Sequence, residues 1–179
     1  FDINNNSVGS AGGPGGANAD WMHLNAINYN ATLDQIVISS ARQNEILVID
    51  HSTTTEEASG HSGGNSDKGG DFLYRWGNPQ NYGRGDDSDK MLEAQHGVNE
   101  IPIGYPGEEN IILFNNNSRL GEENDTSEVI EFRPPDDYYI EDGEAWGPTE
   151  PIWTFEDNFH APKQSGAFRL LNGNTFVTV

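Results

Sequence analysis

The stretch HLNAINYNATLDQIVISSARQNEILVIDHS, residues 23–52, contains three short apolar runs separated by polar residues. Val and Ile are concentrated in the second and third runs, residues 33–40 and 44–52, and a polar turn at 41–44 joins them. β-Branched residues bounded by polar turn residues are typical of β-strands. The stretch therefore predicts a meander of three strands.

The same kind of pattern continues along the rest of the chain. A Gly-rich polar loop, residues 53–71, leads to a fourth run, FLYRWGNP. A second set of four runs comprises HGVNEIPIG, NIILFNNNSR, SEVIEFRPP and PIWTFEDN. A third set opens in QSGAFRLLNGNTFVTV, where Asn172-Gly173 is a two-residue hairpin signal. No segment has a sustained apolar period of 3.6 residues, so we expect few helices.

Matching positions in these sets recur at similar spacing. His96 follows His23 by 73 positions, and Ser165 follows His96 by 69. The aromatic-rich fourth runs are also 79 positions apart, measured from Trp76 to Phe155. Four strands per repeat are typical of a β-propeller blade. The spacing therefore predicts an all-β chain of repeated blades.

We expect a partial propeller domain. Residues 1–20, rich in Gly and Asn, should form a loop or arm, and residues 21–179 should hold blades at about 21–80 and 94–158 and the start of a third at 163–179. A propeller closes with about four to eight blades. About two and a half blades, with an abrupt start at Phe1, indicate a processed chain or fragment completed by further blades or other subunits. A small β-sandwich is the alternative, which explains the length better and the repeat worse.

The composition excludes several classes of function. There are 29 Asp and Glu against 9 Lys and Arg, and the formal net charge of −20 opposes binding to nucleic acid. Cysteine is absent, which excludes disulfides, thiolate zinc sites and thiol nucleophiles. No segment approaches the roughly 20 apolar residues of a membrane span. Four sequons permit glycosylation in a secreted eukaryotic protein, although an Asn-rich chain also produces them by chance; they lie at Asn5, Asn30, Asn116 and Asn124.

Two histidines occupy matching positions in the predicted blades. Because the first strand of each propeller blade lines the central channel, His23 and His96 should meet at one mouth of the channel. Each is followed two or three positions later by an asparagine, Asn25 or Asn99. An imidazole hydrogen-bonded to a nearby carbonyl is the ordinary structural alternative for a single histidine. The repeated arrangement favours a functional pair.

Other polar residues are weaker candidates. Arg119 follows the run ILFNNN, where its guanidinium could bind sulfate or phosphate oxygens or pair with a neighbouring glutamate. His160 precedes the first strand of the third set. It does not occupy the position that matches His23 and His96, which falls near Ser165. His51 and His61 should be solvent-exposed. The acidic turns GDDSDK and GEENDTSE lack the register of a calcium loop, so no metal site is expected.

The ordered blocks of this chain resemble the bacterial arylsulfotransferase type of β-propeller family. The resemblance runs over residues 21–179 and rests on WMHLNAINYNATLDQIVISSARQNEILVIDHST, GGDFLYRWGNPQNYG, QHGVNEIP, ILFNNNSR, PIWTF and SGAFRLLNGNTF. It implies a six-bladed propeller, secreted or periplasmic, that transfers a sulfuryl group from a phenolic sulfate ester to a phenol through a sulfated histidine. It also implies that this transfer requires neither PAPS nor another nucleotide, and no metal or other cofactor.

The resemblance also implies roles for four residues. By motif, His23 and His96 match two histidines of the family's funnel, and Arg119 matches its arginine. His160 is the candidate nearest to the family's nucleophilic histidine; otherwise the nucleophile lies beyond Val179 or is missing. The alternative function is a non-catalytic extracellular propeller that serves as a binding or structural module.

Overall fold

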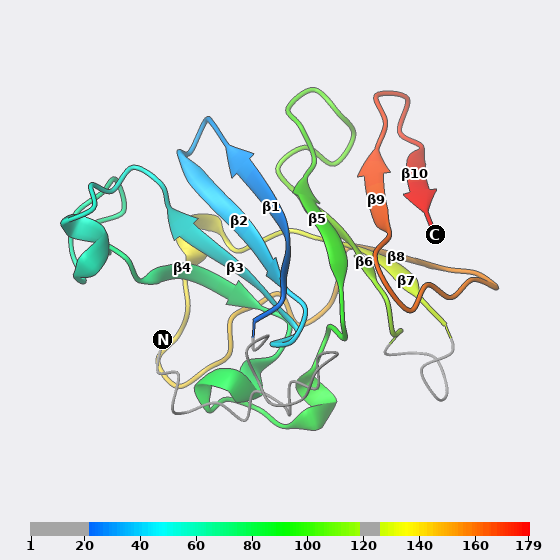
Figure 1. Cartoon of the computed structure of the whole chain (residues 1–179), viewed down its shortest axis with the longest axis horizontal. Coiled ribbons are helices and arrows are strands. Elements are labelled where there is room, and N and C mark those ends of the chain that lie inside the picture. The colour runs from blue at the N-terminus through cyan, green and yellow to red at the C-terminus, as the bar shows by residue number, and fades with distance from the viewer. Residues whose placement is uncertain (1–21, 119–125) are drawn as a thin grey trace.

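Ten antiparallel strands make up the regular structure of the computed structural model, which describes residues 22–118 and 126–179 (Figure 1). The first four and the next four strands form two sheets in chain order, β1-β2-β3-β4 and β5-β6-β7-β8, and β9 pairs with β10. The all-β prediction and each predicted strand are confirmed. The strands are β1 (Leu24–Asn30), β2 (Gln35–Ser40), β3 (Glu45–Asp50), β4 (Phe72–Trp76), β5 (His96–Glu100), β6 (Ile111–Asn115), β7 (Glu128–Phe132), β8 (Trp153–Glu156), β9 (Gly166–Arg169) and β10 (Thr175–Thr178).

Helical structure in the described ranges is limited to short 3-10 turns, as the missing helical period predicts. They are η2 (Glu57–Ser59), η3 (Pro79–Tyr82), η4 (Asp87–Asp89) and η5 (Asp136–Tyr138). None of the described helices is long and apolar enough to cross a membrane.

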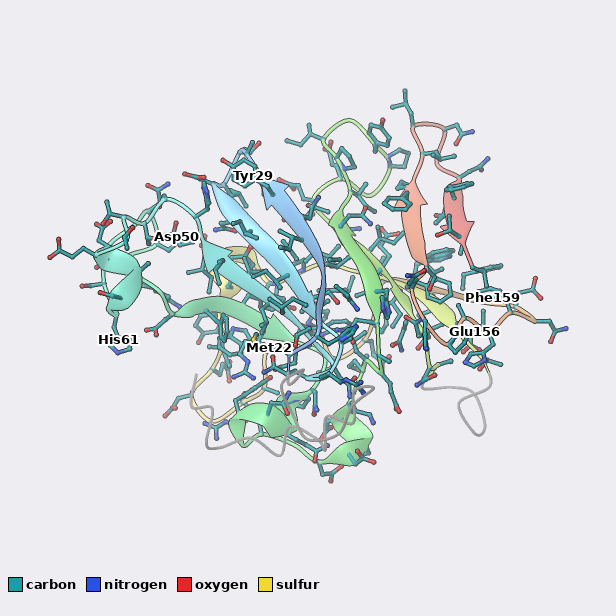
Figure 2. The ribbon with its side chains drawn as sticks, in the orientation of Figure 1. Met22, Tyr29, Asp50, His61, Glu156 and Phe159 are labelled. Atoms are coloured by element: carbon teal, nitrogen blue, oxygen red, sulfur yellow. The ribbon has the colours of Figure 1, made fainter. Side chains whose placement is uncertain are left out.

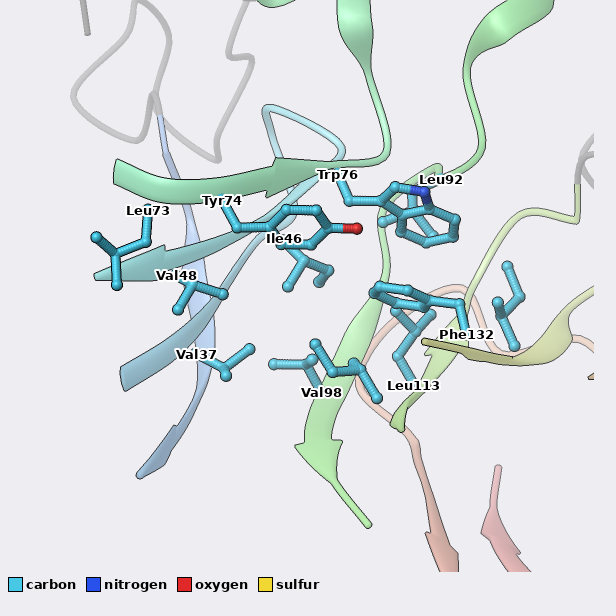
Figure 3. Close-up of a cluster of buried hydrophobic side chains, with 12 residues drawn as sticks. Val37, Ile46, Val48, Leu73, Tyr74, Trp76, Leu92, Val98, Leu113 and Phe132 are labelled. Carbon is cyan, nitrogen blue, oxygen red and sulfur yellow. The ribbon is translucent and has the colours of Figure 1, made fainter. Parts of the chain in front are cut away.

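The first two sheets, which we call meander A (β1–β4) and meander B (β5–β8), pack against each other through one apolar cluster. Its buried members come from both meanders, and Trp76 of β4 stacks on Phe132 of β7 with ring centroids 3.9 Å apart (Figure 3). The loop after β7 covers this junction, where Pro148 accepts a hydrogen bond from the Trp76 indole (2.8 Å). The two meanders therefore share a core. Figure 3 labels ten of the cluster's residues, among them Val37, Ile46, Val48, Leu73, Tyr74, Leu92, Val98 and Leu113.

A second apolar cluster lies on the other face of meander B. Ile112, Phe114 and Val129 pack there with Ala167 of β9. Side chains alternate between the two faces of a strand, so β6 and β7 contribute to both clusters. Meander B is thus placed between meander A and the β9–β10 hairpin.

The hairpin itself is confirmed, but its loop is longer than the two residues that Asn172-Gly173 suggested. The last paired residues are Arg169 and Thr175, and Leu170 donates from its backbone to the carbonyl of Asn174 (2.8 Å). Gly173 has a φ of 87°, a conformation that glycine adopts without strain. The glycine therefore turns the chain, within a wider loop.

The first strands of the three sets, β1, β5 and β9, lie side by side in this order (Figure 1). Asn25 donates to the carbonyl of Gln95 (2.7 Å), and further along the strands Asn28 accepts from the Glu100 backbone (3.2 Å). Asn99 of β5 donates in the same way to the carbonyl of Ala167 (2.9 Å). The residue numbers of the bonded partners increase in the same direction along both strands, so these neighbouring strands run parallel. Asn25 and Asn99 join successive first strands.

Candidate functional site

The segment that carries His23 is held against the turn between β2 and β3. His23 accepts a backbone hydrogen bond from Ala41 (3.2 Å), and Met22 accepts one from Arg42 (3.2 Å) and another from the Ser40 hydroxyl (2.7 Å). His23 itself has a φ of 49°, in the left-handed region where histidine is enriched among non-glycine residues. Its side chain is exposed at the start of β1.

His96 begins β5 and is half-buried. The preceding residue, Gln95, is fully buried, and its amide nitrogen donates to the carbonyls of Ser40 (3.1 Å) and Glu45 (3.0 Å) of meander A. This anchor places the start of β5 beside the start of β1. The imidazole rings of His23 and His96 consequently lie edge to face, with centroids 6.5 Å apart and an interplanar angle of 72°.

A buried asparagine at the end of β6, Asn116, connects His96 to the third set of strands. Its side-chain oxygen lies 2.8 Å from Nδ1 of His96. Its side-chain nitrogen donates to the carbonyls of Ala161 (2.6 Å) and Gln164 (2.9 Å) and lies 3.2 Å from the Ser165 hydroxyl. Sequence reasoning considered Asn116 only as a sequon. Three consecutive asparagines at the end of a buried strand were the available signal, because such a run is costly to bury without partners.

The sequon at Asn116 cannot carry a glycan in this fold, because the side chain is 0% exposed and both ends of its amide are engaged. Asn30 accepts backbone hydrogen bonds from Thr32 and Leu33 at the β1–β2 turn. Asn5 and Asn124 lie outside the described residues.

The third set of strands approaches His96 closely. Gly97 has a φ of 65°, and a Cβ there would lie 2.9 Å from the carbonyl oxygen of Ser165. The predicted slot near Ser165 is therefore adjacent to the start of β5. Glycine is required at 97 because a larger residue would collide with this backbone.

The other two predicted site residues are His160, which the structure describes, and Arg119, which it does not. His160 is exposed, and the structure records no hydrogen bond or ring contact between its imidazole and His23 or His96. Its neighbours are fixed, since the Phe159 carbonyl accepts from the Ser127 backbone (3.1 Å) and the Ala161 backbone donates to the Ser127 hydroxyl (3.0 Å). Arg119 lies outside the described residues.

The remaining histidines are exposed, as predicted, and each contacts a carboxylate. Nδ1 of His51 lies 2.7 Å from Asp34, and Nδ1 of His61 lies 2.9 Å from Asp71. Hydrogen bonds from His51 and then Tyr29 hold the pKa of Asp34 below its usual range. These pairs are surface contacts away from the ends of β1 and β5 that carry His23 and His96.

The acidic turn GDDSDK is closed on itself. Asp86 accepts from the Ser88 backbone (2.8 Å), while Asp89 accepts from the Asp86 backbone (2.7 Å), so both carboxylates cap η4. The second acidic turn falls largely outside the described residues. Within residues 22–118 and 126–179, no group of three or more His, Asp or Glu side chains is arranged to hold a metal ion.

A cleft of about 860 Å³ lies at the other ends of β1 and β5. It is lined by Tyr29 and Asn30 of β1, Glu100 of β5 and Tyr138 of the loop after β7. Figure 2 labels Met22, next to His23, and Tyr29, which lines the cleft, at opposite ends of β1. The cleft and the histidine pair therefore lie at opposite ends of this strand. Burial raises the pKa of Glu100, an effect that a hydrogen bond from Asn30 opposes, and burial also raises the pKa of Tyr138.

Comparison with known proteins identifies the family. A search of the curated proteins found no match. A family model described as Arylsulfotransferase (ASST) matches residues 3–138, which include His23, His96 and Arg119 and end before His160. The match covers more than half of the chain, so this protein belongs to the arylsulfotransferase family.

Proposed function

We propose that this protein transfers a sulfuryl group between phenolic compounds without PAPS, and that the transfer takes place where β1 and β5 begin. The observation that carries the proposal is the edge-to-face contact of His23 and His96, 6.5 Å apart although 73 positions separate them in the chain. Family membership supports phenolic substrates in general. Two imidazoles beside each other can exchange protons with a phenol oxygen that binds between them.

The proposed architecture is a β-propeller in which meanders A and B are consecutive blades within residues 21–179 and β9–β10 begins the next. Two packed sheets alone would equally suit a β-sandwich. The parallel order of β1, β5 and β9 and the recurrent asparagine bonds between them favour blades, because first strands of consecutive blades lie side by side around a channel. A six-bladed ring would be completed by strands other than the ten described.

The first proposed chemical step forms a sulfohistidine. A phenolic sulfate ester binds near His23 and His96, and an imidazole nitrogen of His160 bonds to sulfur while the bond from sulfur to the phenol oxygen breaks. The departing phenoxide takes a proton from the imidazolium form of His96 or His23, which becomes a neutral imidazole. Arg119 would hold the sulfuryl oxygens. Such transfer passes through a loose, oxygen-rich transition state, so positioning and charge neutralisation supply most of the catalysis.

The second step regenerates the histidine. An acceptor phenol gives its proton to the histidine that protonated the first phenoxide, His96 or His23. The phenol oxygen bonds to sulfur, and the bond between sulfur and the nitrogen of His160 breaks. The overall reaction exchanges one sulfated phenol for another.

We further propose that the protein acts outside the cytoplasm, secreted or periplasmic.

The test is turnover by the purified full-length protein with para-nitrophenyl sulfate as donor and phenol as acceptor. We expect His96→Ala to lower turnover by about 10²–10⁴-fold, because a positioned proton-transfer group contributes on that scale. The thermal midpoint should change little, since His96 is only half-buried. His160→Ala should abolish the protein-bound sulfuryl group detected by mass spectrometry after donor is added alone.

The matched control is His51→Ala, which removes an exposed histidine that contacts a carboxylate elsewhere on the surface. This variant should keep full turnover. Equal losses in His51→Ala and His96→Ala would contradict the proposal, and so would full turnover in His96→Ala.

A non-catalytic binding module is the second candidate, and the 860 Å³ cleft favours it, because the cleft lies at the ends of β1 and β5 that do not carry the histidines. Small polar compounds screened by NMR on the intact protein should then shift the signals of Tyr29 and Glu100. The His96→Ala variant should bind them equally well. Shifts confined to His23 and His96 would contradict this second candidate.

A further inference from the structure

The carboxamide of Asn116 has only one orientation that fits its surroundings. The side chain is fully buried, and one of its ends faces the carbonyl oxygens of Ala161 and Gln164 at 2.6 and 2.9 Å. A carbonyl oxygen can only accept a hydrogen bond, so this end must be the NH2 group. The opposite end, 2.8 Å from Nδ1 of His96, is therefore the oxygen.

This orientation determines which nitrogen of His96 carries a proton. Nδ1 faces two acceptors, the Asn116 oxygen at 2.8 Å and the Ala94 carbonyl at 2.9 Å. An unprotonated Nδ1 would meet two oxygens without a hydrogen between them, which costs the desolvation of all three groups. Nδ1 therefore holds a proton, and in the neutral ring the lone pair is on Nε2.

We propose that Asn116 is a positioning residue that holds His96 in the Nδ1-protonated tautomer, so that proton transfer takes place at Nε2. The role of Nε2 in turnover rests on the proposed sulfuryl transfer. The assignment of the tautomer rests only on the two acceptors that face Nδ1. The same amide group ties His96 to residues 161–165, the segment that follows His160. Docking of the third set of strands on meander B therefore fixes one of the two acceptors that orient the ring.

In meander A an alanine stands at the position that corresponds to Asn116. Ser40 of β2 pairs with Glu45 of β3, and Asn115 of β6 pairs with Glu128 of β7. These two pairs occupy the same place in their meanders. The next residue along the chain is Ala41 in meander A and Asn116 in meander B. A methyl group cannot accept a hydrogen bond. Ala41 therefore cannot orient His23 in the way that Asn116 orients His96.

The tautomer of His96 can be tested directly in the protein without substitutions. Long-range proton–nitrogen NMR spectra of the full-length protein, taken at a pH where His96 is neutral, distinguish the two tautomers. The His96→Ala variant identifies the His96 signals. We expect Nδ1 to give the signal of a protonated nitrogen and Nε2 that of an unprotonated one. The reverse pattern would overturn the inference, whether or not the protein turns over phenolic sulfates.

Variants separate positioning from simple structural support. Asn116→Leu removes one of the two acceptors of Nδ1 and leaves the Ala94 carbonyl. The Nε2-protonated tautomer of His96 should therefore become measurably populated, and turnover should fall at least about tenfold because part of the proton-transfer contribution is lost. Asn116→Asp keeps an acceptor for Nδ1 and should keep the tautomer, although it loses the donors to Ala161 and Gln164. The Nδ1-protonated tautomer kept in folded Asn116→Leu would show that Asn116 gives only structural support.

The matched control is Ser165→Ala, which removes one contact of the Asn116 nitrogen and leaves its two carbonyl acceptors. Tautomer and turnover should both stay unchanged. If the expected tautomer is found in a protein without turnover, the proposed function fails and the positioning stands. An active enzyme with His96 protonated at Nε2 instead would retain the proposed function and refute the inference.

Discussion

Meanders A and B place equivalent aromatic residues in the same register but in different environments. Trp76 pairs with Ile46 in meander A, and Phe155 pairs with Val129 in meander B. Trp76 is 2% exposed, because it faces meander B and stacks on Phe132. Phe155 is 40% exposed, because the β9–β10 hairpin covers the inner strands of meander B and not this part of β8. Burial of an equivalent side chain in this fold therefore depends on which sheet lies beside it.

The two meanders also each bury an acidic side chain at one matching position. Glu45 and Glu128 begin β3 and β7 and are both fully buried. Arg75 binds Glu45 through two nitrogens, at 3.0 and 2.7 Å, whereas Glu128 accepts from the amide of Asn115 (3.0 Å). Burial raises the pKa of Glu45, and the hydrogen bonds from Arg75 and Asn81 oppose that rise. A buried ion pair of this kind adds little net stability, because the loss of hydration of both charges offsets their attraction.

Removal of the two equivalent aromatic side chains should have the largest and most unequal effect. Trp76→Ala leaves a cavity in the shared core and should lower the free energy of unfolding by about 3–5 kcal/mol. Phe155→Ala removes a partly exposed ring and should cost about 1 kcal/mol. Urea unfolding followed by circular dichroism measures both. Equal costs would show that the outer face of meander B is covered as well as the junction between the meanders.

A smaller, pH-dependent difference is expected between Asp50, the last residue of β3, and Arg133, which lies at the matching position directly after β7. Burial of Asp50 tends to raise its pKa, but hydrogen bonds from Ser52 and Ser66 outweigh this and hold the pKa below its usual range. An amide at 50 could accept through only one of its two atoms. Asp50→Asn should therefore cost about 1.5–3 kcal/mol at neutral pH, as for hydrogen bonds to a charged group.

The sign of the pH effect follows from the lowered pKa. The stabilisation by ionised Asp50 is present above the ordinary aspartate pKa of about 3.9 and is lost as the pH falls through the lower folded-state value. The difference in stability between the protein and Asp50→Asn should shrink in acid. Arg133→Gln is the control, because its exposed pair with Glu109 is worth at most about 1 kcal/mol. A constant difference at Asp50 from neutral to acid pH would contradict the assignment.

The smallest expected effects concern the asparagines that join the first strands. Asn25→Ala and Asn99→Ala each remove one hydrogen bond between parallel neighbours and should cost about 1 kcal/mol. Similar costs at both junctions would support equivalent packing of A on B and of B on β9. The exposed Asn158 is the control, where alanine should change stability by less than about 0.5 kcal/mol. A loss confined to one junction would show that the repeat is not structurally regular.

Much of the fold and part of the candidate site could be predicted from the sequence. Runs such as IVISS and EILVID predict strands because β-branched residues fit a pleated, half-buried surface. The recurrence of His23 and His96 before such runs led to the expectation that they meet, and their rings do lie together. Asn25 and Asn99 accompanied the histidines in the sequence without revealing that their amides donate to the neighbouring strand.

Asn116 shows why the rest could not be predicted. Its partners come from 94–96 and 161–165, segments that only the packing of three sets of strands brings together. His160 precedes the third set of strands in the sequence without sharing the position of His23 and His96, and only the structure shows that its side chain is exposed. Neither outcome depends on local preferences of the chain.

The sequence by itself determined the strands, their order and the histidines that begin β1 and β5, because strand propensity and repeat spacing are local properties of a chain. Only the tertiary structure decided that Trp76 is buried while Phe155 is not, and that Asn116 holds His96. Burial and hydrogen-bond partners depend on which surfaces meet, and residues far apart in sequence meet only after the sheets have packed.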